Sequence, residues 1–359
     1  MTPNYLVLQA LRQPDALISL SLADWDLLLR QARHANLLAR LYALLDERGL
    51  IKQLPLQPRE HLEWSHIFAE KHTQAVHWEV ALIRKALAKI GVPIILLKGA
   101  AYAMAELPAA HGRIFSDIDI LVPKDSLNEV EAALMLHGWA ATHHDAYDQR
   151  YYRTWMHELP PMMNIKRSTV IDVHHAILPE TAYVHPDPEK LRAAAQVLDG
   201  YEDLKVFAPV DMVLHSAAHL FHEAELENGL RDLVDIDSLL IHFSYMPSFW
   251  PALVERAKEL ELTRPLFYAL RYSALILHTP IPANTIRAAE VGRPSRPLLA
   301  LMDGLFTRAL MPMHPSCSDR LTGVARRMLF VRANWLRMPP LLLARHLFHK
   351  AFISPKTEE

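Results

Sequence analysis

The sequence predicts an α+β protein that is mainly helical, with a small mixed β-sheet between N-terminal and C-terminal helical regions. Three observations lead to this prediction. Leucine and alanine recur at helical spacing over long stretches, glycine is scarce (10) while proline is abundant (25), and two apolar runs near the middle of the chain alternate like strands. Helices separated by prolines fit this composition better than an all-β fold with glycine-rich turns.

The chain has 359 residues, which is more than one small core usually needs. We therefore expect a helical region over 1–90, an α/β core over 91–180 and a second helical region over 181–359. A net charge of −2 gives no strong signal for nucleic-acid binding. The single cysteine, Cys317, excludes a disulfide within the chain and a cysteine-based zinc site.

The first half of the chain contains the clearest elements. Residues 5–50 predict two short amphipathic helices, and 59–90 predicts one long helix. The run VPIILLKG predicts a buried strand over 93–98. FSDIDILV, over 115–122, predicts a strand with alternating polar and apolar residues, and 124–137 predicts the helix after it.

Strand-like pieces then follow over 139–144, 149–157 and 161–165, and STVIDVHHAI is another alternating strand. Further downstream, the periodicity of 3.6 residues predicts helices only. These helices are expected over 187–198, 209–226, 230–243, 248–260 and 264–278, with more after 295.

A pair of acids on the FSDIDILV strand is the main candidate for chemistry. Asp117 and Asp119 share one strand face, and Ile118 and Ile120 share the other. Asp172 alternates in the same way within VIDVHH, on what we expect to be a neighbouring strand. Three carboxylates that converge from two strands could hold two Mg²⁺ ions for phosphoryl chemistry.

A glycine turn precedes the acidic pair. In LLKGAAY a strand ends and a helix begins, so free backbone N–H groups near Gly99 favour phosphate. Lys98 and Arg113 are candidates to neutralise the oxygens of a triphosphate.

Together, ILLKGAAY, RIFSDIDILV and VIDVHH resemble the nucleotidyltransferase fold of the DNA polymerase β superfamily. More closely, they resemble the bacterial uncharacterised nucleotidyltransferase family, which carries LKG, R-x-x-x-D-x-D-x-L-V and D-x-H motifs in this order. The resemblance is strong over about 91–180. It implies that Asp117 and Asp119 hold metal, that Asp172 helps to hold the catalytic ion and that Gly99 faces nucleotide phosphates.

The function implied by this resemblance is Mg²⁺-dependent transfer of a nucleotidyl group from an NTP, such as ATP, to a hydroxyl of a small molecule or protein. Asp172 would also be the general base. One departure from the superfamily favours an alternative, a degenerate protein that binds without chemistry. Ala100 and Ala101 follow Gly99 where the superfamily has Gly or Ser, and Ser116 is the candidate to replace the missing hydroxyl.

Histidines offer a third hypothesis. His215, His219 and His222 lie on one helix face at a spacing that can bind zinc, so a histidine-based metallohydrolase is an alternative. The zincin glutamate is absent, because Ser216 occupies its position. Structural or substrate-facing roles are therefore favoured. His174, which shares a strand face with Asp172, and His219 are the candidate substrate contacts.

The C-terminal segment 320–350 is basic and apolar, and it contains no acid. It could contact an anionic membrane surface, but packing against the rest of the chain is the favoured interpretation. No secretion signal or run of 18 apolar residues is evident, so we expect a cytoplasmic protein. The basic residues of the segment are Arg320, Arg326, Arg327, Arg332, Arg337, Arg345 and Lys350.

Overall fold

The computed structural model describes residues 4–143, 145–222, 224 and 226–345. Its N-terminal part is helical, as predicted, although residues 5–50 form three α-helices rather than two. The break at Pro14 begins a short 3₁₀ segment that separates the first two helices. The helices are α1 (Leu6–Arg12), α2 (Leu22–His34), α3 (Leu38–Glu47) and the long α4 (Leu56–Leu87).

The α/β core follows α4. Its strand β2 carries the two predicted acids, and Ile118 (6% exposed) and Ile120 (0%) are buried, which confirms the predicted apolar face. The core elements are β1 (Ile94–Leu96), α5 (Lys98–Met104), β2 (Asp117–Leu121), α6 (Leu127–Leu136), β3 (Trp139–Ala141), α7 (Ala146–Trp155), β4 (Met162–Asn164) and β5 (Val170–His174).

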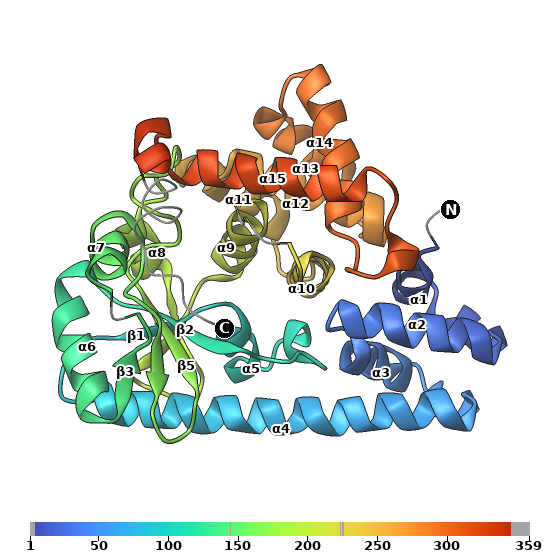
Figure 1. Ribbon diagram of the computed structural model, residues 1–359, viewed down its shortest axis with the longest axis horizontal. Coiled ribbons are helices and arrows are strands. Elements are labelled where there is room, and N and C mark those ends of the chain that lie inside the picture. Colours follow the sequence, from blue (N-terminus) through green and yellow to red (C-terminus); the bar gives the residue numbers. More distant parts are fainter. Residues whose placement is uncertain (1–3, 144, 223, 225, 346–359) are drawn as a thin grey trace.

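The C-terminal part is mostly helical and lies above the sheet in Figure 1, opposite α4. Helix α9 is central, since it packs against α5, α10, α11, α12 and α15. The elements are α8 (Pro188–Ala194), β6 (Gln196–Val197), β7 (Leu204–Val206), α9 (Pro209–His222), α10 (Gly229–Phe243), α11 (Phe249–Glu259), α12 (Thr263–Tyr272), α13 (Ala283–Ala289), α14 (Arg296–Ala309) and α15 (Thr322–Arg337).

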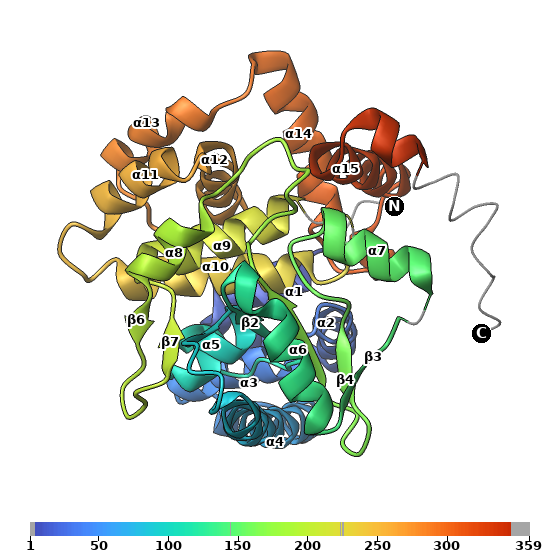
Figure 2. The ribbon, with the colours of Figure 1, turned by 90° about the vertical axis from the view of Figure 1, so that its left-hand side faces the viewer.

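Within the described residues, seven strands form one mixed sheet in the order β3-β4-β5-β2-β1-β7-β6. The pairs β2–β5 and β1–β7 are parallel, and the other neighbours are antiparallel. Figure 2 shows the sheet between α4 below and the C-terminal helices above. The predicted class, a mainly helical α+β protein with a small mixed sheet, is confirmed.

One predicted strand is wrong. Residues 149–157 were expected to be extended, but most of them belong to helix α7. Asp145 caps this helix, because its carboxylate accepts hydrogen bonds from the backbone N–H groups of Tyr147 and Asp148. Tyr151 and Trp155 meet one turn apart, with ring centroids separated by 6.1 Å. Their strand propensity is overridden by this cap and by packing along the helix.

The sheet also extends beyond residue 180, where only helices were expected. Helix α8 ends at Ala194, and the next residues form the edge strand β6 instead of continuing the helix to residue 198. Strand β7 joins the sheet beside β1, with Ile95 opposite Lys205. The boundaries of the three predicted regions otherwise stay a prediction.

The basic C-terminal segment is partly anchored on the protein. Arg326 donates a hydrogen bond to the carbonyl of Met311, and Arg332 donates one to the carbonyl of Phe221. Lys350 lies outside the described residues. In the described part of the chain, no helix combines the length and apolar character needed to cross a membrane.

Candidate active site

The three predicted acids lie on two adjacent parallel strands. Asp119 of β2 is in register with Asp172 of β5. Neighbouring strands are about 4.8 Å apart, so these two side chains project from adjacent positions on the same face. Asp117 is two residues before Asp119 on that face. The hydroxyl of Ser116 donates a hydrogen bond of 2.7 Å to Oδ1 of Asp117. The sheet thus brings the acids together as the alternation predicted.

Asp119 is almost fully buried, with 7% of its surface exposed. Burial alone would raise its pKa, but the nearby Lys98 ammonium and a hydrogen bond from His174 hold the pKa of Asp119 well below its usual range. The Lys98 Nζ atom lies 3.9 Å from Oδ1 of Asp119, and Nε2 of His174 lies 2.8 Å from the same oxygen. Asp119 is therefore an ionised carboxylate held between Lys98 and His174.

Asp172 has the opposite electrostatic character. Burial, followed by the negative charge of Asp119, raises the pKa of Asp172 to about 7. Its Oδ1 atom is buried and has no hydrogen-bond partner. An unpaired buried carboxylate oxygen is costly unless a cation or a proton satisfies it. The two neighbouring carboxylates and this unpaired oxygen therefore fit a divalent cation with oxygen ligands.

The turn between β1 and α5 is strained and closely packed. Lys98 has a backbone φ of 41°, in the left-handed region that is rarely occupied outside glycine. Gly99 follows it, and an added Cβ would lie 2.9 Å from the ring of Phe115 and 3.1 Å from Nε of Arg113. The glycine is thus required by packing between the turn and the segment that leads into β2.

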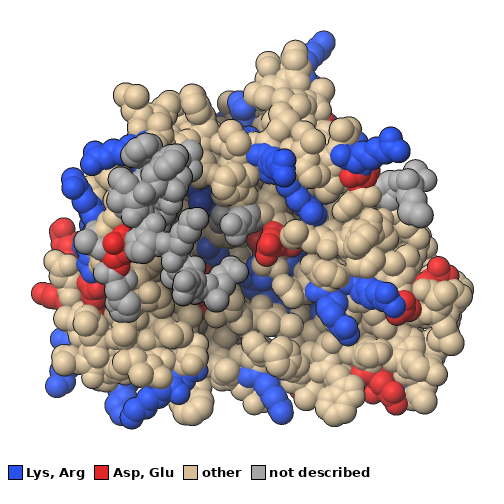
Figure 3. All heavy atoms as spheres, in the orientation of Figure 1, with Lys and Arg blue, Asp and Glu red and all other residues tan. Residues whose placement is uncertain are grey.

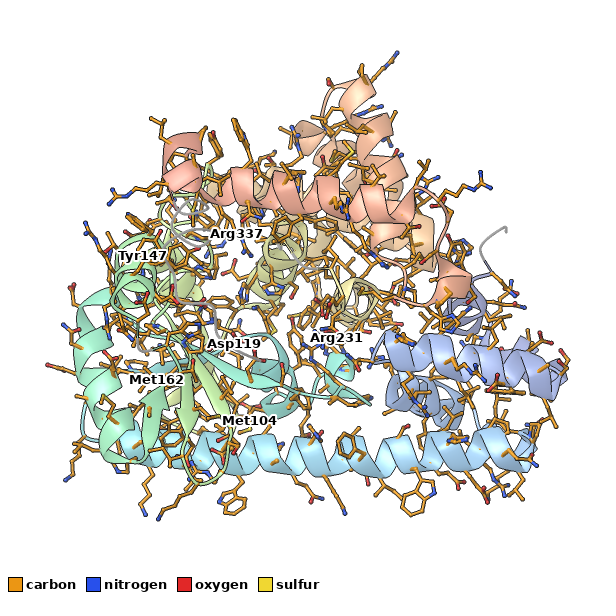
Figure 4. All side chains as sticks on the ribbon, in the orientation of Figure 1. Met104, Asp119, Tyr147, Met162, Arg231 and Arg337 are labelled. Carbon is orange, nitrogen blue, oxygen red and sulfur yellow. The ribbon has the colours of Figure 1, made fainter. Side chains whose placement is uncertain are left out.

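A cavity of about 350 Å³ opens beside these residues, between the core and helices α9 and α10. Figure 4 shows Asp119 on the core side of this space and Arg231 on the α10 side. Figure 3, which has the orientation of Figure 1, shows that the middle of this side of the molecule is hollowed, with Lys and Arg atoms deep inside the hollow. The lining residues include those that the sequence assigned to nucleotide binding, namely Lys98, Gly99, Arg113 and Ser116, together with Asp117, Asp119 and His219.

Arg113 already has a partner at the cavity wall. It forms an ion pair with Asp235 of α10, and both side chains are nearly buried. Arg231 lines the same cavity and pairs with Asp232, with 2.8 Å between Nη2 and Oδ1. Arg113 therefore joins the core to α10, and Arg231 is a second arginine from which a bound anion could accept hydrogen bonds.

Comparison with known protein families decides the classification. A family described as "Uncharacterised nucleotidyltransferase" matches residues 21–278. The chain belongs to this family. The matched region contains α2, α3, α4, the sheet and helices α9 and α10, so it includes every residue that lines the cavity. No curated protein matches the chain.

The chain contains one further acid at the site, Glu158, which the sequence marks together with His157 as a second polar pair able to reach the three acids. Glu158 follows α7 and forms an isolated antiparallel bridge with His174 of β5. Its Oε2 atom lies 3.1 Å from Nδ1 of His174, whose Nε2 contacts Asp119. Burial would lower the pKa of His174, but Glu158 and Asp119 together raise it above its usual value, and the ring lies between these two acids.

His157 adjoins the same group. Among the described residues, His157, Glu158 and His174 are the set of histidine and acidic side chains whose ligand atoms lie within 4.8 Å of one another. Nε2 of His174 is already hydrogen-bonded to Asp119, and Nδ1 of the same ring faces Glu158, so His174 links Glu158 to the acidic site. The sequence signal was weak, because Glu158 precedes two prolines and belongs to no regular strand.

The helical histidines do not form the alternative zinc site in the part of the chain that the structure describes. His215 packs edge-on against Phe207, with ring centroids 5.5 Å apart. Nδ1 of His222 lies 3.0 Å from the carbonyl oxygen of Ala218 in its own helix. Burial lowers the pKa of all three histidines. Only His219 of the three lines the cavity, which leaves the metallohydrolase without structural support.

Proposed function

We propose that this nucleotidyltransferase is Mg²⁺-dependent and moves a nucleoside monophosphate from an NTP to a hydroxyl of a small molecule or protein. The observation that carries the proposal is the unpaired buried Oδ1 of Asp172. Asp172 lies beside Asp119, and Asp119 lines the cavity. The chain that contains them belongs to the nucleotidyltransferase family. A site for cations next to a space for a nucleotide is what this chemistry requires.

Asp117, Asp119 and Asp172 are the residues that would hold the cations, which we expect to be two Mg²⁺ ions. When bound, the cations would neutralise phosphate charge and make the acceptor hydroxyl more acidic. His174 donates to Oδ1 of Asp119 and fixes the orientation of that carboxylate.

The remaining steps are assigned to side chains of the chain. Lys98 lines the cavity and is close enough to Asp119 to contact phosphate oxygens beside it. The acceptor oxygen forms a bond to the α-phosphorus, the bond from this phosphorus to the bridging oxygen of the β-phosphate breaks, and pyrophosphate leaves. Asp172, the carboxylate beside Asp119, accepts the proton of the acceptor hydroxyl.

The acceptor would enter from the α10 side of the cavity. Glu227, Asn228 and Asp232 line that side and offer carboxylate and amide groups. These groups suit hydrogen bonds from a molecule with several hydroxyls. A sugar-derived acceptor is therefore favoured over an apolar one, and by analogy it would resemble an aminoglycoside or a polysaccharide precursor.

A second candidate function is nucleotide binding without transfer. Ala100 and Ala101, which replace the usual Gly or Ser, are each 1% exposed and pack in the core. They offer no hydroxyl to a phosphate. Ser116 lines the cavity, but its hydroxyl donates to Asp117. If the phosphates are held too weakly for catalysis, the protein would be a binding scaffold.

A transfer assay tests the proposal. An NTP labelled at the α-phosphate is incubated with Mg²⁺, the protein and fractions of small molecules or proteins. For the wild type we expect label in an acceptor and release of pyrophosphate. Asp119→Asn should lose both, whereas the exposed control Asp125→Asn should transfer label and release pyrophosphate like the wild type. A thermal shift with NTP and Mg²⁺ but no transfer would support the binding scaffold. Absence of both shift and transfer would refute the proposal.

A further inference from the structure

Helix α4 exposes large apolar side chains on its outer face. Trp64 is 72% exposed, Trp78 is 64%, Phe68 is 52% and Ile67 is 43%. In Figures 1 and 2 this helix forms the lower edge of the molecule, and no other described helix covers its outer side. Isolated exposed apolar residues are common, but two exposed tryptophans on one helix face indicate an interaction surface.

The exposed face follows a heptad pattern over nearly four repeats. Two rows of residues, each with a spacing of seven, run along it, and every residue in both rows is exposed. This is the spacing at which two helices pack side by side. One row is Trp64, Lys71, Trp78 and Lys85, and the other is Glu60, Ile67, Gln74 and Ala81.

The two rows complement each other when one copy of the helix is turned end for end. In antiparallel helix pairs, residues of one row pack against residues of the other. A twofold axis between residues 72 and 73 would place a large residue opposite a small one, an apolar residue opposite an apolar one and a cation opposite an anion. The pairs are Trp64 with Ala81, Trp78 with Ile67, Lys71 with Gln74 and Lys85 with Glu60.

The charges identify the occupant as a second copy of this chain rather than a lipid surface. The exposed face begins with Glu60 and ends with Lys85, so it carries opposite charges at its two ends. An anionic membrane would attract one end and repel the other. An antiparallel copy attracts both, and a twofold interface needs such self-complementarity.

We propose that the outer face of α4 is a homodimer interface in which two copies pair antiparallel about this axis. Trp64 and Trp78 form its apolar part, and the ion pairs between Lys85 and Glu60 at both ends set the register. The interface lies on the side of the molecule opposite α15, so the cavity stays accessible in the dimer.

The molar mass of the full chain in solution tests the interface. Light scattering after size-exclusion chromatography should give twice the 41.0 kDa of the chain. Trp78→Glu should raise the dimer Kd roughly thirtyfold or more, as expected for a central tryptophan. Trp335→Glu, at an exposed tryptophan of α15, should leave the dimer unchanged. A monomeric wild type, or a Trp78→Glu variant that dimerises like the wild type, would overturn the proposal.

Charge reversal tests the register. Lys85→Glu and Glu60→Lys should each raise the Kd about tenfold, because like charges then meet at both ends of the interface. The double variant should recover most of the wild-type affinity. The two residues are about 37 Å apart along one helix, so recovery cannot arise within a single chain. If each single variant weakens the dimer and the double variant does not recover, the antiparallel register is wrong.

Discussion

Replacing Asp172 with asparagine should make the metal-free protein more stable. The carboxyl has a pKa of about 7 in the folded chain and 3.8 as its ordinary value, because burial and the Asp119 charge disfavour ionisation. Between these two values the folded state binds more protons than the unfolded state. Stability therefore falls as the pH rises through this window, and the full cost is present above pH 7. The neutral amide of the Asp172→Asn variant carries no such charge.

The size of the effect follows from this pKa difference. It corresponds to a destabilisation of at most about 4 kcal/mol above pH 7, which decreases toward zero near pH 4. The gain from Asp172→Asn should follow the same curve. A site that costs this much stability without metal is expected where a cation belongs, because the cation replaces the missing partner of Oδ1.

The measurement is urea unfolding of wild type and Asp172→Asn at several pH values in the presence of a chelator. We expect the variant to be the more stable protein at pH 8 and the difference to shrink as the pH approaches 4. Addition of Mg²⁺ should stabilise the wild type more than the variant. A variant that is less stable than wild type at pH 8, or a difference that does not depend on pH, would refute the electrostatic account of Asp172.

Three further predictions concern stability. Gly99→Ala should lower the free energy of unfolding in urea by about 1–3 kcal/mol, because its Cβ would meet the Phe115 ring at 2.9 Å. The control Gly323→Ala has open space around its Cβ and should raise the free energy of unfolding by up to about 1 kcal/mol. His222 has a pKa lowered by burial to about 4, so stability should fall by up to about 1.4 kcal/mol per pH unit as the pH drops from about 6.5, and His222→Gln should flatten that slope. Asp211→Ala should cost about 3 kcal/mol or more, because its buried carboxylate forms two hydrogen bonds to an arginine of α11; a loss below about 1 kcal/mol would contradict this.

The acidic part of the site was predictable because its signal is local. Strand alternation placed Asp117 and Asp119 on one face, and the same alternation identified Asp172. A period of two is visible in a few residues and needs no knowledge of distant contacts. The adjacency of Asp172 and Asp119 was expected because a third carboxylate on a neighbouring strand would complete the site, and the family resemblance implies the same arrangement.

Features that depend on long-range contacts could be predicted only in part: the sequence marked Glu158 as a polar residue near the site, and the family resemblance implied that the helix containing Arg231 lines the pocket, but neither gave the contacts themselves. Glu158 reaches His174 only because an irregular segment bridges to β5. Arg231 joins the cavity wall because α10 folds back over the core, some 110 residues after the acidic pair. Gly99 was interpreted as a residue that lets phosphate approach, and this stays a prediction; the structure adds a contact that the sequence did not indicate, because a Cβ there would lie 2.9 Å from the Phe115 ring. Such contacts between distant segments leave no periodic trace in the sequence.

Errors in the predicted elements have a similar cause. Tyr151 and Trp155 have strand propensity, but the cap at Asp145 and the contacts between their rings select a helix. Strand β6 is two residues long and exists only because β7 pairs with it. A local pattern cannot reveal a strand that is defined by its partner.

Turnover of Asp172→Asn tests the central claim most directly. Once the transfer assay has identified an acceptor, the rate of transfer of labelled α-phosphate is measured for wild type, Asp172→Asn and the exposed control Asp125→Asn. Asp117 and Asp119 can still hold the nucleotide-bound cation, so the variant should retain the thermal shift with NTP and Mg²⁺. It should lose roughly a thousandfold in rate, because the site that activates the hydroxyl is gone. Equal rates in Asp172→Asn and wild type would contradict a transferase mechanism centred on these three acids.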